Sequence, residues 1–135
     1  MVTIDIEYKG QLHCSAIHGP SKSEILTDAP VDIQGRGEAF SPTDLLAASL
    51  GTCMLTVMGM AAKKLGVALD GAAVSVEKHM STNGPRRVSQ LHLSFRLPVA
   101  ISAEHRTALE HAAHTCPVHL SLHPDVAVEL AFRYE

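Results

Sequence analysis

One stretch of the sequence, SPTDLLAASLGTCMLTVMGMAAKKLG at residues 41–66, limits the possible folds more than any other. It begins with Ser41, a good N-cap, followed by Pro42 at the first helical position and Asp44 at the third. Asp44 is also placed to complete a capping box and to complement the helix dipole. Two lysines and Gly66 then supply a stop signal. The stretch therefore predicts a helix from Ser41 to about residue 65.

This helix is apolar nearly all round for most of its length, which is typical of a buried helix. Gly51 and Gly59 lower its intrinsic helix propensity, so we expect them to allow a close approach to a neighbouring element. The chain is 46% hydrophobic but only 4% aromatic, with no Trp. Because such a helix is easier to bury with a second subunit than alone, we expect a homodimer.

The remaining segments predict short strands and one further helix. Alternation of apolar and polar residues indicates strands, and Ser102 caps a second helix that ends near the proline of Cys116-Pro117. Residues 28–40 contain Pro and Gly without periodicity and predict a loop. The expected strands are 2–9, 12–17, 23–26, 67–81, 88–98 and 126–134, the expected further helix is 102–115, and a short helical turn follows at 117–122. The order predicts a single α+β domain over residues 1–135, with largely antiparallel sheets.

Charge and hydropathy exclude several classes of function. The net charge is −3, and 11 basic and 14 acidic residues are scattered without a basic stripe, which argues against nucleic-acid binding. The N-terminal residues alternate like a strand and not like a signal peptide. We expect no membrane-spanning segment, since no apolar run approaches the required length. Without an export signal, the cysteines should lie in a reducing cytoplasm.

The three cysteines are Cys14, Cys53 and Cys116. For each one, packing as a small hydrophobe is the ordinary interpretation. Cys116 lies directly before Pro117, however, so it would cap a short helix whose free amides favour a thiolate. If Cys53 lay beside it, the two would form a peroxidatic and resolving pair. The spacing alone does not show that they meet.

Two other groups of residues could carry chemistry. HAAHTCPVHLSLH, at residues 111–123, contains four histidines around Cys116, and a Cys with two His is a competent zinc set. No established zinc motif occurs, so surface histidines, or one that stabilises the Cys116 thiolate, are the favoured interpretations. Arg36 and Glu38 flank a glycine in the predicted loop, where they either pair locally or line a site at the helix N-terminus.

SPTDLLAASLGTC around Cys53 and HTCPVHLSL around Cys116 resemble the OsmC/Ohr family of osmotically inducible and organic-hydroperoxide-resistance proteins. The resemblance covers most of the chain. It implies an OsmC-like fold with a long central helix, intertwined homodimers with active sites at the interface, and neither metal nor bound cofactor. It also implies a thiol peroxidase that reduces organic hydroperoxides, with Cys53 peroxidatic, Cys116 resolving, and an external dithiol as reductant.

The better-known peroxidases of that family carry a glutamate ten residues before the reactive cysteine and an arginine from the N-terminal hairpin. Here Thr43 stands at the glutamate position, and residues 10–27 contain no arginine. Arg36, Glu38 and Asp44 are the candidates to activate the thiolate or line the site. Two alternative functions remain open, namely a non-catalytic dimer that binds a small apolar molecule, with structural cysteines, and a His/Cys metal carrier.

Overall fold

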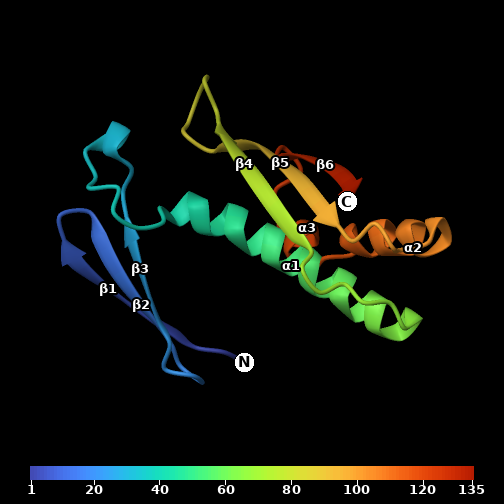
Figure 1. Ribbon diagram of the computed structural model, residues 1–135. Helices are drawn as coiled ribbons and strands as arrows, with labels where there is room; N and C mark the ends of the chain where they lie inside the picture. The colour runs from blue at the N-terminus through green and yellow to red at the C-terminus, as the bar shows by residue number, and fades with distance from the viewer. The chain divides into compact units, whose positions relative to one another are not determined.

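The computed structural model describes all residues from Met1 to Glu135. It consists of two compact units, residues 1–46 and residues 47–135, which are described separately (Figure 1). The expectation of a single domain over the whole chain therefore stays a prediction.

The first unit is a three-stranded antiparallel sheet in the order β1-β2-β3. Its strands are β1 (Ile4–Gly10), β2 (His13–His18) and β3 (Glu24–Asp28), followed by a short 3-10 helix, η1 (Val31–Ile33). The third strand runs two residues further than its pattern predicts, so Asp28 belongs to β3 and not to the loop. Ile4, Ile6 and Tyr8 alternate along β1 as predicted, but all three are exposed in the chain by itself.

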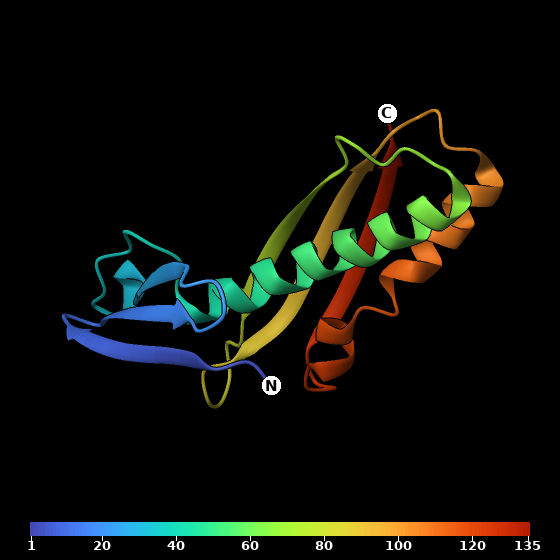
Figure 2. The same cartoon turned by 90° about the horizontal axis from the view of Figure 1, so that it is seen from below.

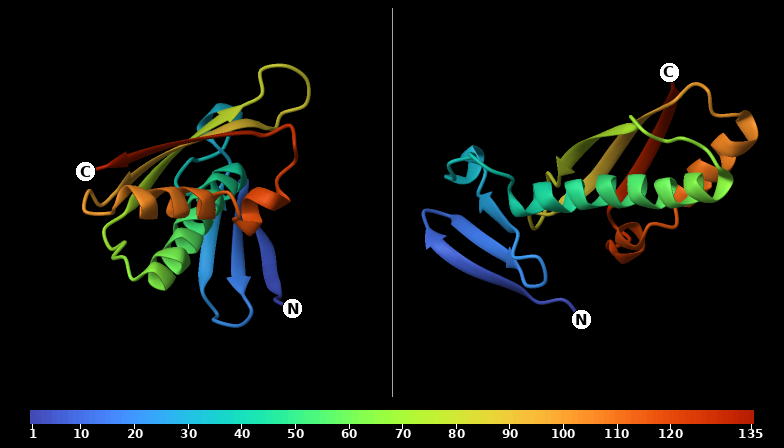
Figure 3. Two further views of the ribbon diagram at one scale, coloured as in Figure 1. Left: turned by 90° about the vertical axis from the view of Figure 1, so that its right-hand side faces the viewer. Right: turned by 60° about the horizontal axis from the view of Figure 1, so that its bottom comes forward.

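The second unit packs helices on one face of a three-stranded sheet (Figures 2 and 3). The elements are helix α1 (Pro42–Leu65, which starts in the first unit), strands β4 (Ala73–Met80) and β5 (Val88–Leu97), helices α2 (Ala103–Ala113) and α3 (Pro117–Ser121), and strand β6 (Ala127–Tyr134). The predicted alternation in β5 defines the core, since Leu91, Leu93, Phe95 and Leu97 are all 0–1% exposed. The opposite face of β5 carries the polar residues of the same strand, which are only partly buried or exposed.

The pairing of β5 with β6 is parallel, whereas β4 pairs with β5 in the antiparallel sense. The sheets are largely antiparallel as predicted, but the alternation of residues in β6 carries no information about its direction. The direction is set by the connection through α2 and α3, which is long enough to return the chain to the end of the sheet where β5 begins.

Helix α1 buries one stripe of side chains in the single chain, and burial of its other faces by a second subunit stays a prediction. The buried residues follow helical spacing and are Ala47, Leu50, Gly51, Met54, Met58 and Ala62. Met60, on another face, is 55% exposed. By length and composition alone α1 is also apolar enough to cross a membrane, contrary to our expectation, and 33% of its most apolar window is buried. Soluble core helices pass the same test.

The two glycines of α1 differ in their surroundings, and this difference leads to a prediction. A Cβ atom at Gly51 would lie 2.9 Å from Val76 Cγ2 and 3.3 Å from Val74 Cγ1, whereas one at Gly59 would have no neighbour within 4 Å. The expected close approach is therefore confirmed for Gly51 and is absent at Gly59. We expect Gly51→Ala to lower the free energy of unfolding by about 1–2 kcal/mol, because overpacking outweighs the gain in helix propensity.

Gly59→Ala is the matched control and should raise the free energy of unfolding by about 0.5–1 kcal/mol. Urea denaturation of both variants at one protein concentration measures the difference, since the stability of an oligomer depends on concentration. Equal midpoints for the two variants would contradict the packing described for Gly51.

Candidate active site

The start of α1 is fixed by the predicted capping box. The Ser41 backbone N–H donates to Asp44 Oδ2 at 2.9 Å, and the Asp44 N–H donates to Ser41 Oγ at 3.1 Å. Ser41 is 2% exposed. The cap sets where the helix begins and hence which face each later residue occupies, including Cys53. Asp44 thus has a structural role in the cap, and its suggested role at a thiolate stays a prediction.

Cys116 is the N-cap of α3, as its position before Pro117 predicts. Its Sγ accepts a hydrogen bond from the backbone N–H of His119 at 3.4 Å, and its side chain is completely buried. Cys53 lies about three turns into α1 and is partly exposed. Both thiols are free.

The structure brings Cys53 and Cys116 together, and their side chains are hydrogen-bonded to each other. Burial raises the pKa of the Cys116 thiol, and the hydrogen bond with Cys53 raises it further. The amides of His119 and Val118 act in the opposite direction but do not compensate. The helix amides favour the thiolate of Cys116, as expected, but desolvation outweighs them and the net pKa is raised. In contact with Cys53, Cys116 is a buried, protonated thiol.

An open apolar groove of about 660 Å³ lies between α1 and the end of α2. Its lining residues are Val57, Met60, Ala61, Lys63, Lys64, Ala112 and Thr115. Val57 follows Cys53 by one helical turn, and Thr115 directly precedes Cys116. Neither cysteine lines the groove itself, whose wall contains two lysines.

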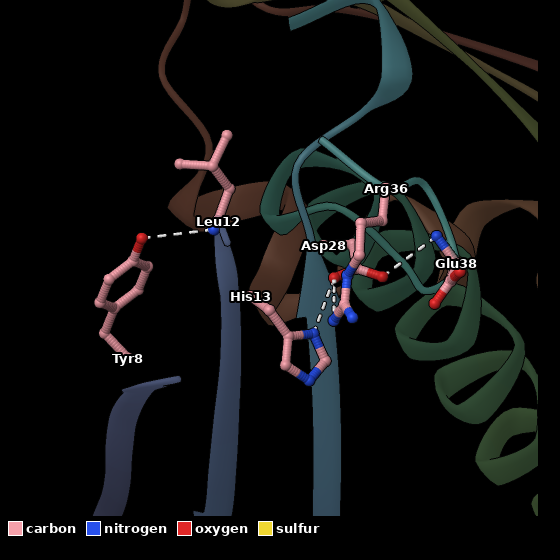
Figure 4. Close-up of polar contacts among 6 residues, drawn as sticks. All are labelled: Tyr8, Leu12, His13, Asp28, Arg36 and Glu38. Atoms are coloured by element: carbon pink, nitrogen blue, oxygen red, sulfur yellow. Dashed lines mark hydrogen bonds and ion pairs between the residues drawn. The ribbon is translucent and has the colours of Figure 1, made fainter. Parts of the chain in front are cut away.

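The first unit contains a separate polar cluster around the buried Asp28, shown in Figure 4. Asp28 Oδ1 is hydrogen-bonded to His13 Nδ1 at 2.7 Å and accepts a hydrogen bond from the Arg36 guanidinium at 3.3 Å. Asp28 Oδ2 accepts a hydrogen bond from the Glu38 backbone N–H at 3.1 Å. Burial opposes ionisation of Asp28, but these three partners outweigh it and lower its pKa. The cluster ties the 29–40 segment to β2 and β3.

Sequence reasoning missed this cluster. Arg36 was expected either to pair locally or to line a site at the helix N-terminus, but Asp28 and His13 were not identified as parts of the same cluster. The signal was the hairpin register, because His13 and Asp28 are opposite each other in the β2–β3 pairing. Arg36 and Glu38 belong to the first unit, and Cys53 and Cys116 to the second, so a role for Arg36 or Glu38 at the thiols stays a prediction.

The Asp28 cluster predicts that the stability of the fold depends on pH in the acidic range. A carboxyl group with a lowered pKa stabilises the fold above its ordinary pKa of 3.8, and this contribution disappears as the pH falls through its pKa in the folded protein. We expect Asp28→Asn to lower the thermal unfolding midpoint at pH 7, with a smaller difference from wild type below pH 4. Thermal unfolding followed by circular dichroism between pH 7 and pH 3 measures this.

Asp5→Asn makes the same change of charge at an exposed position in the same unit and is the matched control. It should leave the midpoint nearly unchanged throughout. A constant difference between wild type and Asp28→Asn at every pH would contradict the ionisation of Asp28.

The histidines around Cys116 do not form a metal site. No group of three or more His, Cys, Asp or Glu side chains is placed to hold a metal ion. The rings of His114 and His119 have centroids 6.3 Å apart, and His123 Nδ1 lies 3.7 Å from Asp125. The metal-carrier alternative therefore gains no support from the structure.

With the fold and the two thiols described, comparison with known proteins identifies the family. Residues 35–131 match the family model of the OsmC-like proteins, which is well over half of the chain. The chain belongs to the OsmC-like protein family. Among curated proteins, no sequence relative matches this chain.

Solved structures of other OsmC and organic-hydroperoxide-resistance proteins resemble this chain. A presumed osmotic stress induced and detoxification response protein from Psychrobacter arcticus 273-4 is 44% identical, with a TM-score of 0.93 over 98% of this chain and 96% of that one. An organic hydroperoxide resistance protein OsmC from Legionella pneumophila is 17% identical, with a TM-score of 0.78 over 98% and 96% of the two chains. A presumed organic hydroperoxide resistance protein from Vibrio cholerae, with captopril bound in one of its active sites, is 20% identical, with a TM-score of 0.78 over 98% and 90%. The last two likenesses show the fold alone.

Proposed function

We propose that this protein is a thiol-dependent peroxidase that reduces organic hydroperoxides through Cys53 and Cys116. The observation that carries the proposal is the contact between the two thiols, one partly exposed and the other completely buried. Peroxide from solvent can reach a partly exposed thiol, whereas a buried thiol is protected from it. This assigns the first attack to Cys53 and the resolving step to Cys116.

The cycle has three steps. The Cys53 thiolate attacks the outer peroxide oxygen, the O–O bond breaks, and Cys53 becomes a sulfenic acid while the alcohol leaves. Cys116 then attacks the Cys53 sulfur, a disulfide forms, and water is released. Finally an external dithiol reduces the disulfide by thiol–disulfide exchange and is itself oxidised. No metal or bound cofactor takes part in this proposal.

The names of the Legionella and Vibrio proteins refer to organic hydroperoxide resistance, and the Vibrio protein binds a small molecule in an active site. Their common fold with this chain supports the same class of function. The apolar groove between α1 and the end of α2 suits a substrate with an apolar substituent.

We also propose that the working protein is a homodimer in the cytoplasm. Helix α1 leaves apolar side chains such as Met60 exposed, and a second subunit would cover them. A cycle that regenerates free thiols needs a reducing compartment. Light scattering that gives a mass of 14.4 kDa, that of a single chain, would contradict the dimer.

The test of the function is a thiol count. Reduced protein mixed with excess cumene hydroperoxide should lose Cys53 and Cys116 within seconds to minutes and keep Cys14. Mass spectrometry of the products should show one disulfide between Cys53 and Cys116. Survival of all three thiols after minutes of exposure would rule the peroxidase out.

The groove favours a second candidate function, a non-catalytic dimer that binds a small apolar molecule. In that case an apolar ligand would raise the thermal midpoint, and the thiols would survive hydroperoxide. The thiol count therefore separates the two candidates.

A further inference from the structure

The thiols of Cys53 and Cys116 are two sulfur donors that are already in contact. Their side chains are hydrogen-bonded to each other, and both thiols are free. Cys116 is held in place as the N-cap of α3, where its Sγ accepts a hydrogen bond from the backbone N–H of His119 at 3.4 Å. Cys53 is carried by α1 and is partly exposed, so a small molecule in solvent can reach it. The two residues therefore form a preorganised dithiol with one accessible member.

The number of donors at the pair determines which kind of ligand it suits. No group of three or more His, Cys, Asp or Glu side chains is placed to hold a metal ion, so the pair has no third protein ligand. A zinc ion takes four protein ligands in structural sites and three in catalytic sites, so two thiols alone do not make a zinc site. Soft elements prefer thiolate sulfur. Trivalent arsenic that carries one organic group is such an element, and it needs only two sulfurs because its third bond is to carbon.

The contact between the two sulfurs also fits the geometry of this ligand. Trivalent arsenic is pyramidal, so its two bonded sulfurs lie close together on one side of the arsenic atom. A linear two-coordinate ion such as Hg²⁺ requires two sulfurs on opposite sides of the metal, which is farther apart than two thiols in contact. The pair therefore suits arsenic without a large displacement of α1 or α3.

We propose that Cys53 and Cys116 together form a chelating site for trivalent organic arsenic compounds. The inference goes beyond the proposed peroxidase and does not depend on it. In the binding step both S–H bonds break and each sulfur forms a bond to arsenic. Two As–OH bonds of the hydrated arsenic compound break, and each hydroxide leaves with one thiol proton as water. Arsenic stays trivalent and neither sulfur is oxidised, so the step needs no oxidant or reductant.

Phenylarsine oxide, which carries one phenyl group on trivalent arsenic, is the probe. In a Cys14→Ser background, we expect one equivalent per chain to remove both remaining thiols from a count with 5,5′-dithiobis(2-nitrobenzoate). Native mass spectrometry should show one phenylarsenic group per chain, and X-ray absorption at the arsenic edge should show two sulfur neighbours. One sulfur neighbour, or one arsenic for every two chains, would overturn the site.

Variants that keep one thiol of the pair measure the chelation. Cys53→Ser and Cys116→Ser, each in the Cys14→Ser background, should bind phenylarsine oxide about 10²–10⁴-fold more weakly than their parent, because the second As–S bond forms within one chain. Cys14→Ser itself should bind as tightly as wild type, since Cys14 is not part of the pair. Cys116 is buried, so Cys116→Ala replaces Cys116→Ser if circular dichroism shows that the serine variant does not fold. Equal affinities of a folded single-thiol variant and its parent would overturn the proposal.

A competition experiment tests whether both sulfurs hold the arsenic. The dithiol 2,3-dimercaptopropanol should release phenylarsenic from the protein, because it also offers two sulfurs to one arsenic atom. Glutathione, which has one thiol, should not release it at the same concentration. Complete release by glutathione would contradict chelation.

A peroxide arm keeps the arsenic site apart from the proposed function. Cumene hydroperoxide is mixed with arsenic-free protein in the Cys14→Ser background, and the oxidation of Cys53 is followed separately. Tight binding of phenylarsine oxide without oxidation of Cys53 would support the arsenic site and overturn the peroxidase. Oxidation of Cys53 together with weak binding in the parent would overturn the arsenic site alone.

Discussion

Cys53→Ser should lose hydroperoxide reduction, with kcat/KM falling by at least about 10³-fold. The serine hydroxyl stays protonated near neutral pH, and it has no sulfur that can be oxidised to a sulfenic acid and then to a disulfide. The change also removes the partner of Cys116, which is buried and protonated and cannot take over the first attack. Consumption of cumene hydroperoxide with dithiothreitol as reductant measures the loss.

Two matched variants complete this test. Cys116→Ser should keep the first oxidation and accumulate a sulfenic acid at Cys53, seen as a single dimedone adduct by mass spectrometry. Cys14→Ser, in strand β2 of the other unit, should keep full activity. The assignment fails if Cys53→Ser consumes peroxide as fast as wild type, or if Cys116→Ser forms no adduct.

The helix ends were the most predictable part of the fold. Ser41 with Asp44, and Ser102 before α2, satisfy free amides by contacts within a few residues, so their patterns carry the complete signal. The same holds for Cys116, whose place before Pro117 makes it the cap of α3. The alternation in β5 likewise predicted its buried face, because a strand with one buried face has a period of two.

The features that the sequence could not show depend on contacts between residues that are far apart along the chain. The parallel direction of β6 and the pairing of His13 with Asp28 follow from how strands meet, which local patterns do not encode. The contact of Cys53 with Cys116 needs α1 and α3 to be placed on the sheet first. Once both thiols are placed, burial reverses the expected effect of the helix amides on Cys116. The candidate pair was therefore predictable as two residues, but its geometry and ionisation were not.

Phe95→Ala should cause the largest loss of stability among the changes considered, about 3–5 kcal/mol in the free energy of unfolding. Phe95 is completely buried at the centre of β5, and its ring stacks on Phe132 with centroids 4.8 Å apart and an interplanar angle of 19°. The parallel register of β5 and β6 places the two residues directly opposite each other. The variant therefore loses a large apolar side chain and leaves a cavity beneath the helices. Urea denaturation at a fixed protein concentration measures the effect.

A double-mutant cycle tests the contribution of the stack. Phe132→Ala alone removes the partner ring, and the double variant should be more stable than the sum of the two single losses predicts, by about 0.5–1.5 kcal/mol. Such a coupling energy is expected because each single change already removes the ring contact, so the second change cannot remove it again. Additive losses would show that the rings do not stabilise each other. A loss below about 1 kcal/mol for Phe95→Ala would contradict the complete burial of Phe95 in the core.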